Sequence, residues 1–436
     1  MSRCQTKFSK ITGLSGKGWK KLFFNRPLDS SGERKNSIYY FRGGFWNEVT
    51  GNTSQISTVV YGLSTEGYRI ASSIAVKGFK VALIDEAARM AISLKPDIAR
   101  TYPDVSSLIE DEPLLALEPV DVAVSEASYI FFAPKIRKVG QEVKSDVTSK
   151  FREAIKAIRK GTSVIYALPT GIGGNNENMG LIEHVTGMSV GKDIFYYYMP
   201  TSLELISSPE IFVGSLNSKQ DTEIAKMVYD PDIKGRLNYI DIVSAEFMHS
   251  IRILGQYTHM ASVLEICKNL KIANIKSEPI NRAFSDLYID DISNGLYDLR
   301  AIASSLGGAG PLMYLVNGSI KGTEGYIKHL IDQIRDLLKT RDLKASRTKV
   351  AIAWTLDPYE MRGDKIELLS SLESKLKDYI GDVERQPWSI FDLYPTEKTR
   401  IVVACSKSDF ARIMTKNKQN PDFIMLKANP VCEIMG

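Results

Sequence analysis

The thirty residues from Ser57 to Glu86 constrain the fold of this chain more than any other stretch. They begin with a short apolar run, rich in β-branched and aromatic residues, which predicts a buried strand. Gly62 ends this run, and apolar residues recur at helical spacing from Gly67 onward. A second apolar run ends at Asp85 and Glu86. The stretch therefore predicts a strand, a glycine turn, a helix and a second strand, which is the order of a βαβ unit.

The glycine spacing of this unit is typical of a fold that binds dinucleotides. Gly62 lets the chain turn off the strand, and Gly67 lets the helix pack close to the sheet. Around Ser64 and Thr65, the helix then offers N–H groups and its positive dipole end to a pyrophosphate. Asp85 follows Gly67 by 18 residues, near the roughly 20 expected for the acid that binds the ribose, and an acid there favours NAD as the cofactor.

Two features of the motif leave a second interpretation open. Ser64 stands where the glycine-rich motif has its middle glycine, so its Cβ crowds the predicted pyrophosphate. Glu66 brings a negative charge to the same place. The alternative is a dinucleotide-binding half that has lost its cofactor.

Composition predicts an enzyme-sized chain of two or three domains, since 44% of the 436 residues are hydrophobic. The sequence shows no run of about 20 apolar residues, so we expect no membrane span. The first residues lack the apolar core of a secretory signal. The four cysteines and four histidines are widely scattered, which predicts reduced thiols, a cytoplasmic location and no metal site.

The first 50 residues differ from the rest in charge. They hold ten Lys or Arg residues against three acidic ones, with aromatic residues interleaved. A basic arm of this kind can contact nucleic acid or an anionic membrane surface. Because no folded recognition motif accompanies it, we expect instead a partly ordered extension over residues 1–55, packed by its aromatic residues against the main body, and no nucleic-acid partner.

Strands and helices alternate after Glu86, which predicts a parallel sheet with helices on both faces. We expect residues 56–202 to form a Rossmann domain that binds NAD. Within it, residues 87–109 are expected to be irregularly helical, and Val122–Val124 to be strand.

The remainder of the chain predicts a helical part followed by a second α/β part. Residues 203–345 are expected to form a central helical domain, dominated by an apolar-periodic run from Val243 to Leu270. At 1.5 Å per residue that run spans roughly 40 Å, long enough to connect two domains and to offer a face to a second subunit. Residues 346–436 predict a smaller Rossmann-like domain. The predicted fold is thus α/β, with an N-terminal Rossmann domain, a long helical connector and a smaller C-terminal Rossmann-like domain.

This order of domains resembles the UDP-glucose/GDP-mannose dehydrogenase family over roughly residues 57–432. Six segments match family motifs in the family's order. The first is a strand that ends in a proline turn (Tyr129–Pro134), and the second resembles the turn T-V-P-P-G (Ala167–Gly171). The others resemble Y-S-P (Tyr198–Pro200), A-E-x-x-K at the head of the long helix (Ala245–Glu246), G-G-x-C (Gly307–Gly310) and F-K-P…D-x-R (Trp354–Arg362).

The resemblance implies NAD-dependent oxidation of the C6 alcohol of a UDP- or GDP-linked sugar to a uronate. The long central helix indicates a homodimer, and the alternative is that its apolar face is covered within one chain. The resemblance assigns residues to the cofactor (Pro134, Pro169, Thr170), to catalysis (Glu246) and to the nucleotide sugar (Gly307, Gly308, Arg362). Lys321, in its own glycine-flanked stretch, is a further candidate phosphate ligand. A guanidinium suits a diphosphate, and the alternative for Arg362 is a surface residue paired with Asp364 or Glu360. For Lys321 the alternative is an exposed lysine in a glycine-rich loop.

The chain departs from the family at the residues that carry the chemistry. A family cysteine attacks the aldehyde formed by the first oxidation, and this position falls on Gly310. The lysine that stabilises the developing oxyanion falls on His249, its asparagine partner on Ile253, and the glutamate after Y-S-P on Thr201. These replacements argue against a full four-electron oxidation by the family's route.

Three interpretations remain. In the first, substituted groups retain dehydrogenase activity, and His249 acts as the general base of a two-electron oxidation of an alcohol by NAD; a helix histidine beside Met248 and Ile251 is otherwise a packed residue. In the second, the chain is a catalytically inactive protein that binds NAD or a nucleotide sugar, or that partners an active relative. In the third, the basic amino-terminal arm makes it an interaction protein.

Overall fold

The structure is a computed structural model in which the chain divides into two compact units, residues 1–54 and 55–436. In the first unit it describes three strands, and in the second it describes residues 57–111, 116–138, 140–200, 210–228, 236–272, 284, 286–307, 310–386, 398–416 and 423–435.

The three strands of the first unit form an antiparallel sheet. β2 (Ser37–Arg42) lies between β1 (Lys21–Phe24) and β3 (Phe45–Glu48). The predicted packing of the aromatic residues of this arm against the main body concerns side chains that lie outside the described part of the chain.

The larger sheet of the second unit has nine strands around a parallel core. In spatial order they are β12 (Arg236–Asp241), β11 (Glu210–Ser215), β10 (Phe195–Tyr198), β9 (Ser163–Tyr166), β8 (Tyr129–Phe132), β4 (Ser57–Tyr61), β5 (Lys80–Asp85), β6 (Met90–Leu94) and β7 (Ala116–Pro119). The five strands from β10 to β5 run parallel, whereas β6, β7 and β11 each join their neighbours nearer the core in antiparallel fashion.

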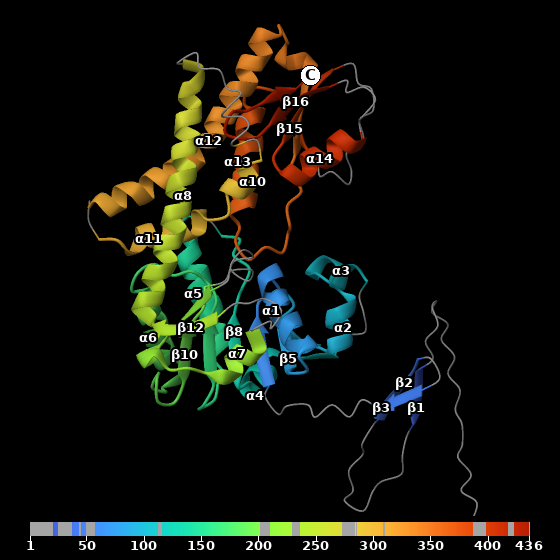
Figure 1. Ribbon diagram of the computed structural model, residues 1–436, viewed down its shortest axis with the longest axis vertical. Coiled ribbons are helices and arrows are strands. Elements are labelled where there is room, and N and C mark those ends of the chain that lie inside the picture. The colour runs from blue at the N-terminus through green and yellow to red at the C-terminus, as the bar shows by residue number, and fades with distance from the viewer. Residues whose placement is uncertain are drawn as a thin grey trace, which may run out of the picture. The chain divides into compact units, whose positions relative to one another are not determined.

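Helices cover both faces of this sheet because successive residues of each core strand point to opposite sides. Val60 of β4 packs with α1 on one face, whereas Val59 and Tyr61 pack with α5 and α6 on the other. The first face carries α1 (Thr65–Val76), α2 (Pro96–Thr101), α3 (Val105–Glu110) and α7 (Thr222–Val228). The second carries α4 (Val120–Glu126), α5 (Glu142–Ile155) and α6 (Gly174–Thr186) (Figure 1).

The prediction that Val122–Val124 form a strand is wrong, because these residues lie in α4. Ala123, Val124 and Ala127 are buried against the sheet, and Val120 packs beside them. This is the i, i+3, i+4, i+7 spacing of a helix face. Three adjacent apolar residues, Val122–Val124, suggested a buried strand, but the side chain of Val122 is exposed and is not part of the buried helix face.

The prediction of irregular helix over residues 87–109 is correct for α2 and α3 and wrong for β6. Asp85 accepts a hydrogen bond from the N–H of Ala87 (2.9 Å), and Arg89 adopts a positive φ of 53°. The chain therefore turns back at once and runs antiparallel to β5.

The smaller sheet has five strands in the order β14 (Val383–Arg385), β13 (Thr348–Ala353), β15 (Thr399–Ala404), β16 (Phe423–Lys427) and β17 (Ile434–Met435). All neighbours are parallel except β16 and β17. One face packs against α12 (Pro311–Thr340) and α13 (Asp364–Lys377), and the other against α14 (Lys407–Lys416). The predicted α/β fold with a second, smaller Rossmann-like sheet is confirmed.

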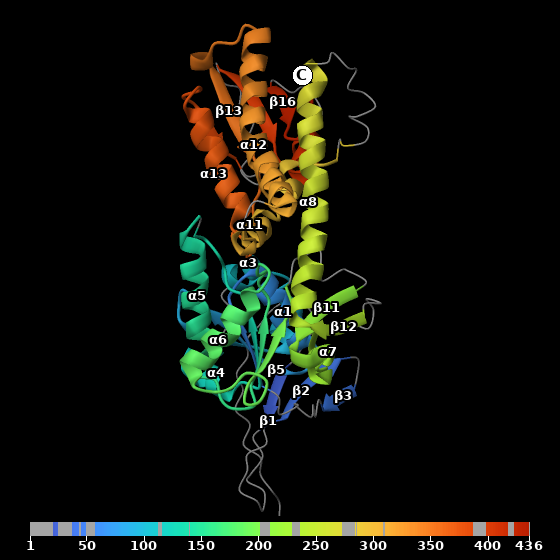
Figure 2. The ribbon, with the colours of Figure 1, turned by 90° about the vertical axis from the view of Figure 1, so that its left-hand side faces the viewer.

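The 31-residue helix α8 (Ile242–Ile272) runs beside both sheets (Figures 1 and 2). Ala245 near its start belongs to the core of the larger sheet, and Leu264 near its end belongs to the core of the smaller one. It packs against α12, with Gly322 so close to Ala261 that a Cβ there would lie 2.8 Å from the alanine Cβ. Among the residues described between α8 and α12 lie two short helices, α10 (Ile289–Ile292) and α11 (Leu296–Ser305). None of the helices described combines the length and the apolar character that a membrane crossing needs.

Candidate functional site

The two glycines of the first βαβ unit are required by close backbone contacts. Gly62 has a φ of +124°, and a Cβ there would lie 2.2 Å from the carbonyl oxygen of Ala133. A Cβ at Gly67 would lie 2.3 Å from the carbonyl oxygen of Gly62. Side chains are excluded at both positions, which are the ones that the sequence spacing predicts for a dinucleotide-binding turn.

Ser64, in the place of the middle glycine, faces the interior of the protein. Its side chain is 0% exposed. The hydroxyl donates a hydrogen bond to the carbonyl oxygen of Ala133 (2.7 Å) and accepts one from the N–H of Gly67 (2.9 Å). Ser64 is therefore the N-cap of α1, and it uses one of the N–H groups that a helix terminus offers to an anion.

The amino terminus of α1 is in contact with a distant segment of the chain, residues Asp357–Met361 between β13 and α13. The N–H of Thr65 donates to the carbonyl oxygen of Tyr359 (2.7 Å), and the Thr65 hydroxyl donates to the carboxylate of Asp357. In the opposite direction, the N–H of Met361 donates to the buried carboxylate of Glu66 (2.8 Å). The predicted phosphate-binding turn thus has three polar contacts with the loop that opens the second Rossmann-like part.

Residues that follow β8 hold the same segment from its other side. One guanidinium nitrogen of Arg137 donates to the carbonyl oxygens of Pro358 and Glu360, both at 2.7 Å. The N–H of Ile136 donates to the carbonyl oxygen of Met361 (2.8 Å). The segment therefore lies between the start of α1 and the loop after β8.

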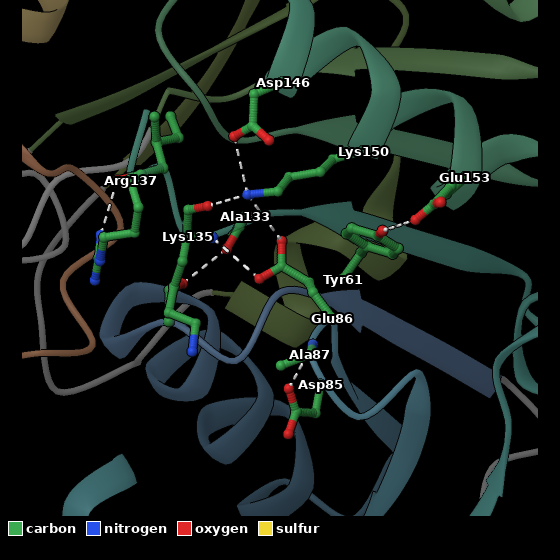
Figure 3. A network of polar contacts seen from close by, with 12 residues as sticks. Tyr61, Asp85, Glu86, Ala87, Ala133, Lys135, Arg137, Asp146, Lys150 and Glu153 are labelled. Carbon is green, nitrogen blue, oxygen red and sulfur yellow. Dashed lines mark hydrogen bonds and ion pairs between the residues drawn. The ribbon is translucent and has the colours of Figure 1, made fainter. Parts of the chain in front are cut away.

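The acidic pair at the end of β5 lies at the same edge of the sheet but makes separate contacts (Figure 3). Asp85, the predicted ribose acceptor, is partly exposed and binds the N–H of Ala87. Glu86 accepts a hydrogen bond from the N–H of Lys135 (3.3 Å) and lies 3.9 Å from the ammonium of Lys150. Burial raises the pKa of the Glu86 carboxyl, an effect that the charge of Lys150 opposes. Glu86 therefore joins β5 to the loop after β8.

The predicted cofactor residues of the next two strands are also at this edge, because the carboxyl ends of parallel strands meet there. Pro134 follows β8, and Pro169 and Thr170 follow β9; all three are buried. The N–H of Thr170 donates to the hydroxyl of Tyr198 (3.2 Å).

Glu246, a predicted catalytic residue, caps a second helix of the sheet. It lies in α8 and is 1% exposed. Its carboxylate accepts hydrogen bonds from the N–H of Gly173 (2.7 Å), the N–H of Asn175 (3.0 Å) and the side-chain amide of Asn175 (2.7 Å). A carboxylate at the amino terminus of α6 is stabilised by the helix dipole, so the contacts explain Glu246 as an internal cap.

His249 and Arg362 meet at a common buried partner, Asp298 of α11. The Nε2 of His249 lies 3.2 Å from one oxygen of Asp298, and the Nε of Arg362 donates to the other (2.8 Å). Burial acts to raise the pKa of the Asp298 carboxyl, but the Arg362 charge and the His249 contact outweigh it and hold this pKa below its ordinary value. The cluster ties α8, α11 and the loop before α13 together, and the surface alternative for Arg362 is wrong because this side chain is buried.

Solved structures with this arrangement of sheets include several enzymes. A UDP-D-ManNAc dehydrogenase from Pyrococcus horikoshii superposes with a TM-score of 0.61 at 12% identity, over 87% of this chain and 96% of the other. A UDP-glucose dehydrogenase from Pyrobaculum islandicum gives 0.58 at 13% identity, over 87% and 95%. The UDP-N-acetyl-mannosamine dehydrogenase Cap5O from Staphylococcus aureus gives 0.56 at 14% identity, over 86% and 95%.

The chain has the nucleotide-sugar dehydrogenase fold. The resemblance that the sequence motifs indicated is thereby confirmed at the level of the fold. No family model matches the sequence, and no curated protein matches it.

Three further predicted residues, Gly307, Gly310 and Lys321, lie just before α12 or within it. Gly310, at the position of the family cysteine, is the N-cap of α12. Both Gly310 and Gly307 are exposed. Lys321 is exposed on α12 rather than in a loop, so the loop expectation is wrong. The glycines near Lys321 suggested a loop, but Gly322 lies within the helix, where it allows α12 to pack closely against α8. Thr201 and Gly308 lie outside the described residues.

Sequence reasoning missed the residues that engage the predicted ones. Asp298 binds His249 and Arg362, and Asn175 binds Glu246. Asp357 and Tyr359 bind Thr65 at the start of α1, and Arg137 binds carbonyl oxygens of the same segment. Asp357 and Tyr359 belong to the stretch matched to the family's F-K-P…D-x-R turn, which was the available signal. Nothing in a single sequence pairs Arg137 with carbonyl oxygens more than 220 residues away.

Proposed function

We propose that this protein is a nucleotide-sugar dehydrogenase-like protein that binds NAD and a UDP- or GDP-linked sugar without oxidising the sugar to a uronate. The fold supports the nucleotide part of the proposal, since ligands of open α/β sheets bind beyond the carboxyl ends of the strands. In the family's reaction NAD would supply the hydride acceptor, a step that we propose this chain does not carry out.

The observation that carries the second part is the state of the predicted catalytic side chains. Glu246 is fully buried under three hydrogen bonds, and His249 shares Asp298 with Arg362 in a buried cluster. A general base has to reach the proton that it abstracts, and a nucleophile has to be present at the position that Gly310 fills. The buried contacts favour a structural role for these residues and a protein without the four-electron reaction.

The residues at the carboxyl edge fit a dinucleotide in part. Gly62 and Gly67 retain the required turn, and Asp85 is partly exposed at the end of β5. The N–H groups of Thr65 and Gly67, however, already have partners within the chain. Asp85→Arg is expected to abolish NAD binding because it removes the ribose acceptor, and an unchanged dissociation constant in calorimetry would overturn the assignment.

Absorbance at the NADH band tests the lack of oxidation. The purified full chain is incubated with NAD and a panel of UDP- and GDP-linked sugars, and we expect no NADH while calorimetry detects the binding of NAD. Steady NADH formation with any sugar would contradict the proposal and restore the interpretation that His249 acts as a base.

We also propose a second copy of the chain as a partner. Val243, Phe247 and Ile251 recur every four residues on α8 and are 48%, 45% and 64% exposed. Leu312 and Leu315 in the first turns of the neighbouring helix α12 are exposed as well. An apolar stripe on one helix is self-complementary about a two-fold axis, which supports a homodimer through the central helices.

A further inference from the structure

The amino terminus of α1 has the features of a phosphate site, but three of its N–H donors have partners within the chain. A dinucleotide pyrophosphate binds to free N–H groups in the first turn of this helix. The N–H of Thr65 binds Tyr359, the N–H of Gly67 binds Ser64, and the N–H of Tyr68 makes the first helical bond, to the Ser64 carbonyl. An N–H that donates along one line to a carbonyl oxygen does not at the same time donate to a phosphate.

The groups that Asp357–Met361 places at this terminus are chemically similar to phosphate oxygens. Tyr359 contributes a carbonyl oxygen, 2.7 Å from the Thr65 nitrogen, and Asp357 contributes a carboxylate that accepts from the Thr65 hydroxyl. Electron-rich oxygens, and a negative charge in particular, are stabilised at the positive end of a helix dipole. The oxygen atoms of this segment and those of a pyrophosphate can therefore accept hydrogen bonds from the same helix terminus.

Both ends of the segment are fixed elsewhere. Before it, the N–H of Thr355 donates to the carboxylate of Asp409 (2.9 Å). After it, Arg362 is bound to Asp298. Met361 is 0% exposed in the core of the larger sheet, so Asp357–Glu360 is the stretch that has to move for the helix terminus to open. Arg137 holds that stretch by its bonds to the carbonyl oxygens of Pro358 and Glu360.

We propose that Asp357–Glu360 occupies the pyrophosphate position of the chain's own dinucleotide site. NAD binds only when this stretch leaves, so the stretch inhibits NAD binding. This rests on the proposed function, in which NAD is a ligand. The segment competes through the Thr65 donors, and Arg137 sets how firmly it is held.

The test compares the NAD affinities of the full-length chain and its Arg137→Ala variant by calorimetry. Loss of a positive charge weakens the binding of an anion if electrostatics alone acts. Loss of the clamp instead frees the segment, and we expect a dissociation constant for NAD at least about 10-fold lower in Arg137→Ala. The two explanations thus predict opposite signs. Arg69→Ala is the matched control, because Arg69 is an exposed arginine on α1 itself, and its loss is expected to leave the constant within about 2-fold.

A second measurement follows the segment without any ligand. Mass spectrometry of amide hydrogen exchange, over peptides that cover residues 63–68, is expected to show faster exchange in Arg137→Ala than in the unaltered chain, since the Thr65 N–H loses its partner more often. Equal or weaker NAD binding by Arg137→Ala overturns the inference while the proposed function stands. The absence of NAD binding in both proteins overturns the proposed function and the inference with it. Unchanged exchange in Arg137→Ala overturns the inference alone, because Arg137 then does not hold the segment.

Discussion

Asp364 carries a buried carboxyl whose charged form the fold disfavours. It begins α13 and accepts a hydrogen bond from the N–H of Tyr297 (2.9 Å). Burial raises the pKa of Asp364 to about 7, partly opposed by that hydrogen bond, with the nearby Asp298 charge adding to the increase and Arg362 opposing it.

A raised carboxyl pKa makes the folded state bind a proton more tightly than the unfolded chain, whose carboxyl titrates near 3.9. The contribution of Asp364 to the free energy of unfolding is therefore fully present below about pH 4 and is lost as the pH rises through about 7. The difference is on the order of 4 kcal/mol, at 1.36 kcal/mol for each unit.

The variant Asp364→Asn retains an acceptor for Tyr297 and removes the titration. We expect its free energy of unfolding, relative to that of the unaltered chain, to rise between pH 5 and pH 8 in urea denaturation. Asp378→Asn, at the exposed carboxyl end of the same helix, is expected to show no such trend. Parallel pH profiles for Asp364→Asn and the unaltered chain would contradict the prediction.

The buried ion pair of the same region gives a second prediction. Asp298→Ala leaves the guanidinium of Arg362 buried without its carboxylate, and removing one partner of such a pair costs about 3–5 kcal/mol. Asp332→Ala, which removes an exposed carboxylate 3.6 Å from Arg335, is expected to change stability by less than about 1 kcal/mol. Urea denaturation monitored by circular dichroism measures both, and similar small losses would show that the buried pair contributes little.

Single residues were predictable from the sequence where the requirement is local. Close backbone contacts exclude a side chain at Gly62 and Gly67, and the spacing of the two glycines was enough to identify them. The partners of Thr65 and His249 were not predictable, because Asp357 lies 292 residues from Thr65, and a buried aspartate such as Asp298 has no distinguishing pattern.

At the scale of elements, α1 shows how a tight turn fixes a helix on a sheet. Gly67→Ala would bring a Cβ within 2.3 Å of the Gly62 carbonyl oxygen and 2.9 Å of the Ser64 hydroxyl oxygen. Because backbone cannot easily yield, we expect a loss of about 1–3 kcal/mol in the free energy of unfolding.

The matched control for that substitution is Gly180→Ala in α6. Gly180 is exposed within the helix, and a Cβ there would have no atom within 4 Å. Alanine lowers the entropy of the unfolded chain, so we expect a gain of about 0.5–1 kcal/mol. Thermal and urea denaturation distinguish the two signs, and equal effects would mean that the contact at Gly67 is not strained by a methyl group.

Elements with one dominant periodicity were predicted well, and short mixed ones were not. The strands of the parallel core follow from short continuous apolar runs, and α8 follows from a long apolar-periodic run. α4 was mistaken for a strand because its three apolar residues are adjacent, and β6 was mistaken for helix because a hairpin turn set by Asp85 precedes it. In both cases the deciding contact is with the sheet, outside the local sequence.

On the scale of the whole molecule, the chain supplies its own acceptors at the helix termini of its larger sheet. Asp357 and Tyr359 come to α1 from the smaller Rossmann-like part, and Glu246 comes to α6 from the long helix α8. Each contact joins elements far apart in sequence. The contacts that fill the predicted ligand positions therefore also hold the two sheets and α8 together.

The proposed homodimer also belongs to the scale of the whole molecule, and its proposed interface is the exposed stripe of α8. Phe247→Lys places a charge in the middle of that stripe without disturbing the core, because the side chain is exposed. Burying a lysine ammonium in an apolar interface is costly, so we expect the unaltered chain to sediment as a dimer at micromolar concentration and Phe247→Lys as a monomer. Ser262→Lys, an exposed polar position further along α8, is expected to remain dimeric. A monomeric unaltered chain, or a dimer that persists in Phe247→Lys, would exclude this face as the interface.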